Sequence, residues 1–233
     1  MTRKMRGRRM VVGLLVQNAL WVIGMGVLLF ASAGTLRWPA AWVFLATIAV
    51  LGVATSFWLL KIDPALLAER MNVTLQKNQP VTDKIFMLVF ASLILIWFIV
   101  IGLDHRVNGS DFSIPLQVFG FILLLASLGF SLWVMRTNSF AAPVVKIQAE
   151  RGHHVISSGP YAWVRHPMYS GALVFFVGMP LMLGSWWGLA LIPVFALLFG
   201  YRSGIEEQVL IEGLPGYADY RTRVRYRLMP GVW

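Results

Sequence analysis

The chain has 233 residues, of which 58% are hydrophobic and only 13% are charged, and its net charge at pH 7 is +10. A soluble domain carries roughly 25% charged residues, and it cannot bury this much apolar surface while its outside stays in water. Lipid must therefore surround most of the protein. The sequence contains no cysteine, which excludes disulfides, thiolate nucleophiles and cysteine-ligated metal sites.

Four apolar runs occupy the first part of the chain. They span residues 10–33, 40–60, 85–103 and 114–135. Each approximates the ~20 residues that cross a ~30 Å hydrocarbon layer as a helix. The first run follows a basic segment, as a signal peptide does, but it is too long and no clear cleavage site follows, so we interpret it as a retained span.

A last apolar region covers residues 170–200 and is interrupted at residues 184–188 by the sequence Gly-Ser-Trp-Trp-Gly. We predict a helical hairpin whose turn is rimmed by interfacial tryptophans. Pro167 suits the first turn of the first arm, and the second arm can run on through Arg202 into Glu206. The alternative is one long tilted helix, since a glycine inside a helix costs only ~1 kcal/mol.

Basic residues mark one face of the membrane. Nearly all of the 20 Lys and Arg residues lie in the N-terminal tail, in the loops after the second and fourth runs, and in the C-terminal tail, whereas the opposite face holds Arg37 and Arg106. The positive-inside rule predicts cytoplasmic N- and C-termini and an even number of crossings. We expect an all-α, polytopic integral membrane protein with about five to six transmembrane helices. The charge of +10 then reflects topology and contact with membrane lipids, and we expect no nucleic-acid partner.

Polar residues outside the spans concentrate in residues 138–169 and 202–227. These two stretches flank the hairpin, so its fold brings them together at the membrane surface. No apolar run carries a clear charge at its centre, which lowers the expectation of a pump, channel or ion-coupled transporter.

The first polar stretch places Arg165 and His166 just before Pro167, where a helix can begin. A helix N-terminus offers free N–H groups to an anion, and arginine adds a fork that suits a carboxylate. An interfacial turn anchored by aromatic side chains explains the same residues equally well. The physical argument leaves both interpretations open.

The second polar stretch places Arg202, Glu206 and Glu207 at the cytoplasmic end of the last helix. Arg202 and Glu206 share a helix face and could form a solvated salt bridge, whereas adjacent acids could also bind the ribose or amine of a cofactor. His153, His154 and His166 lack the spacing and partners of a metal site, so we predict no bound metal. No phosphate-binding glycine motif follows a strand.

The ordered motif Gly-Pro-Tyr-x-x-x-Arg-His-Pro-x-Tyr-x-Gly at residues 159–171 resembles the signature of the isoprenylcysteine carboxyl methyltransferase family and of the related phospholipid methyltransferases. The resemblance continues in Arg-x-x-x-Glu-Glu-x-x-Leu at 202–210, in Gly-Tyr-x-x-Tyr at 216–220 and in Arg-Leu-Met-Pro at 227–230. It covers roughly residues 138–233. We therefore divide the chain into N-terminal transmembrane helices at 1–137 and a methyltransferase catalytic region at 138–233.

The resemblance implies methyl transfer from S-adenosylmethionine to a lipophilic, membrane-borne acceptor, such as the carboxylate of an isoprenoid or prenylated molecule or a lipid amine. It implies catalytic roles for Arg165, His166, Arg202, Glu206 and Glu207, with Arg202 orienting an anionic acceptor. The cofactor-binding residues that it implies are Gln148, His153, Gly159, Tyr161, Arg165, His166, Pro167, Tyr169, Glu206 and Glu207.

Two other interpretations are open. The ending Tyr-Arg-Leu-Met-Pro at residues 226–230 also resembles membrane sterol reductases, which use NADPH. The adjacent acids at 206 and 207 and the short chain favour the methyltransferase. A non-enzymatic membrane scaffold is the second alternative. The short, very basic polytopic chain leads us to expect a bacterial cytoplasmic membrane.

Overall fold

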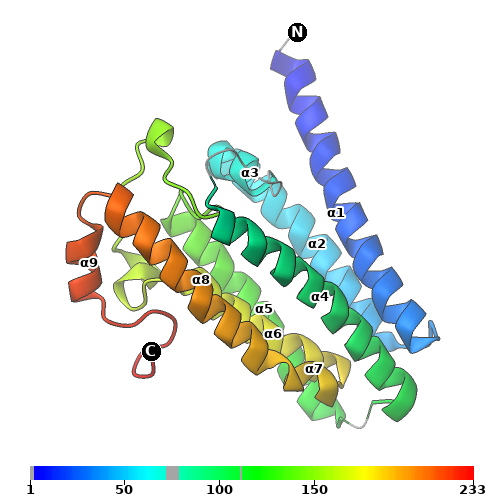
Figure 1. Cartoon of the computed structure of the whole chain (residues 1–233). Helices are drawn as coiled ribbons and strands as arrows, with labels where there is room; N and C mark the ends of the chain where they lie inside the picture. Colours follow the sequence, from blue (N-terminus) through cyan, green and yellow to red (C-terminus); the bar gives the residue numbers. More distant parts are fainter. Residues whose placement is uncertain (1–2, 72–78, 111) are drawn as a thin grey trace.

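The computed structural model describes residues 3–71, 79–110 and 112–233, and all regular secondary structure in these residues is helical. The long helices form a bundle (Figure 1). They are α1 (Arg3–Ala33), α2 (Pro39–Ile62), α4 (Val81–Asn108), α5 (Ile114–Thr137), α6 (Pro167–Leu183) and α8 (Ile192–Gly213). The shorter elements are α3 (Pro64–Met71), α7 (Trp186–Ala190), α9 (Tyr217–Arg223) and the 3₁₀ turns η1 (Ala149–Arg151) and η2 (Gly159–Ala162).

Within the described part of the chain, five helical segments are long and apolar enough to cross a membrane. They are α1 from Met10 onward, α2, α4, α5, and α7 together with α8. α6 is a shorter apolar helix of 17 residues that lies against α5 and α8. The predicted all-α, polytopic membrane protein is thereby confirmed.

The predicted hairpin is present, and the alternative of one long helix is wrong. α6 begins at Pro167, and α8 continues past Glu206 to Gly213, as expected. Gly184 ends α6 in the left-handed region at φ 72°, where a Cβ would lie 2.1 Å from Ser110 Oγ. Glycine is therefore required at the turn.

A buried aspartate fixes the hairpin turn. Asp104 Oδ2 accepts hydrogen bonds from Ser185 Oγ at 2.7 Å and from the Trp187 amide at 3.0 Å. Ser185 Oγ in turn accepts from the amide of Gly188 at 2.9 Å and so caps α7. Because Asp104 and Ser185 are buried away from competing water, these contacts attach the turn firmly to the end of α4.

Two glycines allow α5 and α6 to pack with their backbones almost touching. A Cβ on Gly120 would lie 2.4 Å from the amide nitrogen of Met182, and one on Gly178 would lie 2.7 Å from that of Leu124. Small residues at helix contacts are how membrane helices gain van der Waals packing, since lipid supplies no hydrophobic driving force between them. This pairing positions the start of α6, where the polar residues gather.

An aromatic core joins the hairpin to α4. Phe176 of α6 stacks on Phe195 of α8 with ring centroids 4.2 Å apart, and the fully buried Trp97 of α4 packs edge-on against both. The Trp97 indole N–H donates to the carbonyl of Gly188 at 2.9 Å. The hairpin therefore cannot move relative to α4 without losing this packing.

The polar segments gather at one end of the bundle. α3, the loop between α5 and α6, and α9 lie at the end where α1 begins, whereas α7 lies at the opposite end (Figure 1). The two polar stretches meet directly, because the amides of Arg165 and His166 donate to the carbonyls of Tyr226 and Arg227 at 3.0 and 2.9 Å.

Candidate active site

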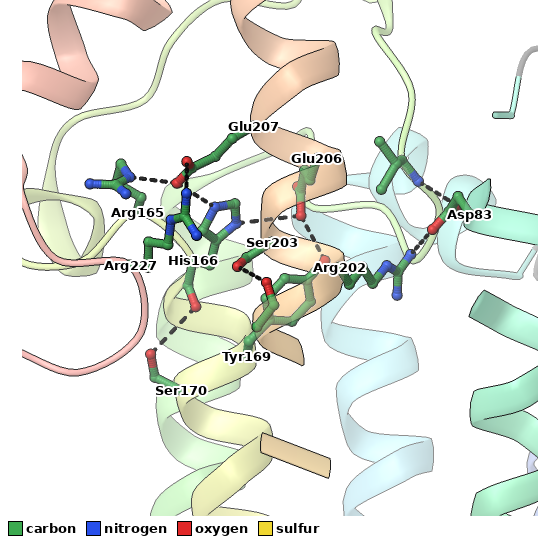
Figure 2. A network of polar contacts seen from close by, with 12 residues as sticks. Asp83, Arg165, His166, Tyr169, Ser170, Arg202, Ser203, Glu206, Glu207 and Arg227 are labelled. Carbon is green, nitrogen blue, oxygen red and sulfur yellow. Dashed lines mark hydrogen bonds and ion pairs between the residues drawn. The ribbon is translucent and has the colours of Figure 1, made fainter. Parts of the chain in front are cut away.

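A buried ion pair lies at the start of α6. Arg165 Nε donates to Glu207 Oε1 at 2.6 Å, and the two side chains are only 6% and 3% exposed. Arg165 precedes the first residue of α6 by two positions, and Glu207 lies on α8, so the pair joins the two arms of the hairpin. Figure 2 shows these side chains pointing toward one another between the arms.

The C-terminal segment encloses this pair. Arg165 NH1 donates to the carbonyls of Val224 at 2.7 Å and Arg225 at 2.6 Å. Arg227 NH2 lies 3.1 Å from Glu207 Oε2, so one carboxylate meets two arginines. From the sequence, the basic charge of the chain as a whole was attributed to topology and membrane lipids, but the Arg227 guanidinium lies against Glu207. This segment is therefore part of the site's framework.

His166 lies between the two acidic residues. Its Nε2 is 3.2 Å from Glu207 Oε1, and its Nδ1 is 3.4 Å from Glu206 Oε2. Burial alone would lower the pKa of His166, but the hydrogen bonds to Glu206 and Glu207 outweigh it, and the pKa is raised above its ordinary value. The geometry favours an imidazolium that donates from both nitrogens.

Glu206 faces a different environment from its neighbour Glu207. The Tyr169 hydroxyl donates to Glu206 Oε2 at 2.6 Å, and the Glu206 side chain keeps 29% of its surface exposed. Tyr169 is held by stacking, with its ring nearly parallel to those of His166 and Phe199 at centroid distances of 5.5 and 5.1 Å. Glu206 is thus an oriented carboxylate with a free side.

Arg202 is paired with an acid that the sequence interpretation missed. Its NH2 lies 3.1 Å from Oδ1 of the fully buried Asp83 on α4, and it also donates to the carbonyl of Pro143. Asp83 Oδ2 accepts from the amide of Val145 at 3.0 Å. The solvated salt bridge with Glu206 that the spacing allows does not form, because Arg202 turns toward α4 instead (Figure 2).

A cavity of about 370 Å³ opens beside these groups. Its polar lining includes His153, Tyr161, Arg165, His166, Tyr169, Arg202 and Glu206. Its apolar lining includes Met87, Phe90, Met168, Ala172 and Phe199, from α4, α6 and α8. One space therefore joins a charged end to an apolar region inside the bundle.

The remaining predicted residues lie outside the lining of this cavity. They are Gln148, Gly159, Pro167 and Glu207. Glu207 lies behind Arg165 and His166. Gly159, the first residue of η2, adopts a left-handed conformation at φ 57°, where a Cβ would lie 3.0 Å from Thr137 Oγ1.

Gln148 shapes the loop that covers the site. Its Nε2 donates to the Phe140 carbonyl at 2.9 Å, and its amide donates to His153 Nδ1 at 3.3 Å. The His153 ring stacks on Phe140 at 4.4 Å. Gln148 therefore positions the wall that His153 contributes.

Tyr161 completes a second wall. Its hydroxyl accepts from Asn138 Nδ2 at 2.8 Å, and its carbonyl accepts from the Tyr220 hydroxyl at 2.8 Å. Burial raises the pKa of Tyr161 above its ordinary value, so the phenol stays neutral. Tyr217 and Tyr220 of α9 line the same cavity, and the motif at residues 216–220 was the sequence signal for them.

Two charged residues of the site come from the N-terminal helices and were not predicted. Asp83 lies in the first turn of α4, and Arg70 lies in the last turn of α3. Nothing local in the sequence pairs Asp83 with Arg202, and the charge of Arg70 was attributed to topology alone. Their roles became visible only once the helices were packed.

Comparison with known proteins matches the part of the chain that builds this site. The phospholipid methyltransferase family matches residues 116–214. The protein-S-isoprenylcysteine O-methyltransferase of Schizosaccharomyces pombe is 31% identical over 110 residues, which are 46% of each chain. The enzyme of the same name from Saccharomyces cerevisiae is 33% identical over 84 residues, 35% of each chain.

These matches cover less than half of the length of either curated relative. The family match at residues 116–214 nevertheless includes α6, α8 and the two residues before α6. It therefore contains Arg165, His166, Tyr169, Glu206 and Glu207. The resemblance expected from the motifs is confirmed. Over less than half of its length, the chain is therefore similar to the phospholipid methyltransferase family and to protein-S-isoprenylcysteine O-methyltransferases.

Proposed function

We propose that the protein transfers a methyl group from S-adenosylmethionine to a lipophilic, membrane-borne acceptor. The acceptor class comprises carboxylates of isoprenoid or prenylated molecules and lipid amines. The observation that carries the proposal is the cavity of about 370 Å³, whose lining changes from charged and aromatic residues to apolar residues. A polar cofactor and the tail of a lipid need these two environments side by side.

The cavity's polar side chains fit the cofactor's chemistry. S-adenosylmethionine, when bound, supplies a methyl group on a positively charged sulfonium. The face of Tyr161 attracts such a cation by about 0.5–2 kcal/mol where it faces the sulfonium, whereas the Tyr169 ring is already stacked on His166 and Phe199. The exposed side of Glu206 offers a carboxylate to a positive centre or to ribose hydroxyls.

The site's residues serve mainly to position and to balance charge. Direct displacement at a methyl carbon requires alignment of the acceptor with the leaving group more than a nucleophile made by the protein. A carboxylate acceptor is already ionised and needs no base. An amine acceptor must lose a proton, and Glu206 is better placed to take it than His166, because both nitrogens of His166 face carboxylates.

Within this proposal Arg165 and Glu207 hold the framework. Their ion pair and the contacts of Arg165 with the carbonyls of Val224 and Arg225 keep the C-terminal segment against α6. His166 then carries its positive charge between Glu207 and the cavity-facing Glu206. Gln148 and Gly159 act on the loop backbone, and Pro167 begins α6.

We propose that the site opens to the cytoplasm. The support is the distribution of Lys and Arg, which concentrates at the end of the bundle that holds the cavity. On this orientation both termini are cytoplasmic, the cofactor enters from water and the acceptor enters from the bilayer. The bacterial cytoplasmic membrane remains the proposed location.

Calorimetric binding to detergent-purified protein tests the cofactor. We expect S-adenosylmethionine and its demethylated product to bind and NADPH not to bind. Binding of NADPH alone would replace the proposal with the reductase alternative. Binding of none of the three by folded protein would favour a scaffold.

A further inference from the structure

Arg70 lines the cavity from the side of the chain that the family comparison does not reach. It lies in α3, a short helix anchored by the buried Leu66 and Leu67, whereas the matched region starts at residue 116. Its NH1 donates to the carbonyl of Ala141 at 3.0 Å, in the loop that covers the site. Arg70 is thus fixed at the edge of the cavity.

The other lysine and arginine side chains that line the cavity are neutralised. Arg165 pairs with Glu207 at 2.6 Å, Arg202 pairs with Asp83 at 3.1 Å and Lys146 pairs with Glu69 at 2.7 Å. Among the residues that the structure describes, no carboxylate forms an ion pair with Arg70. A positive charge without a balancing carboxylate therefore faces the cavity.

This charge is costly to leave without a partner. Burial lowers the pKa of Arg70 below its ordinary value, which reflects the loss of water around the guanidinium. Arginine nevertheless stays protonated in proteins and carries five N–H donors, and the hydrogen bond to Ala141 engages one of its nitrogens. The remaining fork matches the two oxygens of a carboxylate.

We propose that Arg70 anchors the carboxylate of a ligand in this cavity. The inference rests on the proposed function and deepens it. It moves the anion-binding role from Arg202, which Asp83 neutralises, to Arg70 of α3, which lines the same cavity. Two ligands can supply the carboxylate: a prenylated acceptor and the amino-acid end of S-adenosylmethionine.

Three variants separate charge from fold. Arg70→Gln removes the charge and retains a donor for the Ala141 carbonyl, and Arg70→Lys retains the charge without the fork. Arg136→Gln is the matched control, because Arg136 is an exposed arginine in the last turn of α5. Thermal unfolding in detergent establishes that each variant is folded before binding is measured.

Two pairs of ligands identify the source of the carboxylate. The first pair is N-acetyl-S-farnesylcysteine, assayed as methyl acceptor for KM and kcat, and its carboxamide, which has no carboxylate to methylate and is assayed as a competitive inhibitor for Ki. The second pair is S-adenosylmethionine and its decarboxylated analogue, assayed by calorimetry. We expect Arg70→Gln to weaken one carboxylate ligand by about 10- to 100-fold while its carboxylate-free partner is unaffected, and Arg70→Lys to lie between.

If Arg70→Gln raises only the KM for N-acetyl-S-farnesylcysteine, Arg70 binds the carboxylate of the acceptor. If it lowers only the affinity for S-adenosylmethionine, Arg70 binds the carboxylate of the cofactor. Unchanged values for both carboxylates in folded Arg70→Gln would overturn the inference and leave the proposed function intact. Wild-type protein that binds no S-adenosylmethionine would overturn both.

Discussion

Glu206 and Glu207 are adjacent in the chain but meet different partners. Glu207 accepts from Arg165 Nε at 2.6 Å and lies behind the cavity, whereas Glu206 accepts from the Tyr169 hydroxyl at 2.6 Å and lines the cavity. Successive helix residues point about 100° apart, so one acid can hold the framework while the next faces a ligand.

Replacing Glu207 with Gln should destabilise the protein strongly. The change removes the negative charge between Arg165 and Arg227 and leaves buried positive charge without balance. Breaking a buried pair from one side costs about 3–5 kcal/mol. Thermal unfolding in detergent measures the loss, and Glu212→Gln is the matched control on the exposed end of α8. Equal stability of the two variants would contradict the framework role.

Tyr169→Phe should impair the site without disturbing the fold. The phenyl ring keeps its stacking on His166 and Phe199, but Glu206 loses the hydroxyl donor at 2.6 Å. A hydrogen bond to a charged group contributes about 1.5–3 kcal/mol, so we expect S-adenosylmethionine affinity or turnover to fall about 10- to 100-fold. The unfolding temperature should fall by no more than the loss of this one hydrogen bond explains, so the variant stays folded. Full affinity and turnover would show that Glu206 needs no orienting donor.

The raised pKa of His166 predicts a specific pH dependence of stability. A raised folded-state pKa means that the folded protein binds this proton more tightly than the unfolded chain, whose histidine pKa is about 6.5. The stabilisation is complete below about pH 6.5 and is lost as the pH rises through the folded-state pKa. Unfolding temperatures between about pH 6 and 9 should therefore fall in the wild type and change less in His166→Asn. His154→Asn, at an exposed position, is the control and should keep the wild-type dependence of unfolding temperature on pH. The same dependence in His166→Asn would contradict the assignment to His166.

Gly120→Ala should be far more damaging than Gly129→Ala, although both positions lie in α5. A Cβ at Gly120 would lie 2.4 Å from the backbone nitrogen of Met182, whereas a Cβ at Gly129 meets nothing within 4 Å. Overpacking typically costs about 1–3 kcal/mol, while alanine at an open helix position is favourable by up to about 1 kcal/mol. Unfolding temperatures of the two variants compare them directly. Similar values would mean that α5 and α6 do not pack as closely as described.

Asp83→Asn should expose the dependence of the site on α4. Arg202 loses its carboxylate at 3.1 Å, and the Val145 amide keeps only an amide oxygen as acceptor. We expect destabilisation and a loss of turnover of about tenfold or more, because Arg202 also packs over Phe86 and Tyr169. Asp219→Asn, at an exposed position of α9, is the control. Unchanged turnover in Asp83→Asn would show that the site does not depend on the pairing of Arg202 with Asp83.

The fold was largely predictable because membrane helices leave local signals. Apolar length marked the spans, Pro167 marked the start of α6, and Gly184 marked the turn. The pairing of Arg202 with Asp83 left no such signal, since 119 positions separate them and nothing local links them. Which of two adjacent acids faces the cavity depends on the rotation of α8, which packing sets. Arg70 was overlooked because the positive-inside rule already explained its charge.

Transfer of a labelled methyl group tests the central claim most directly. Purified protein in nanodiscs made from a bacterial lipid extract would be incubated with methyl-tritiated S-adenosylmethionine, and the organic phase would then be counted. We predict protein-dependent label in the lipid phase, reduced about 10- to 100-fold by Glu206→Gln. The measurement would be repeated with added N-acetyl-S-farnesylcysteine as acceptor. If neither the lipid extract nor this acceptor gave more label than protein-free nanodiscs give, methyl transfer at this site would be contradicted.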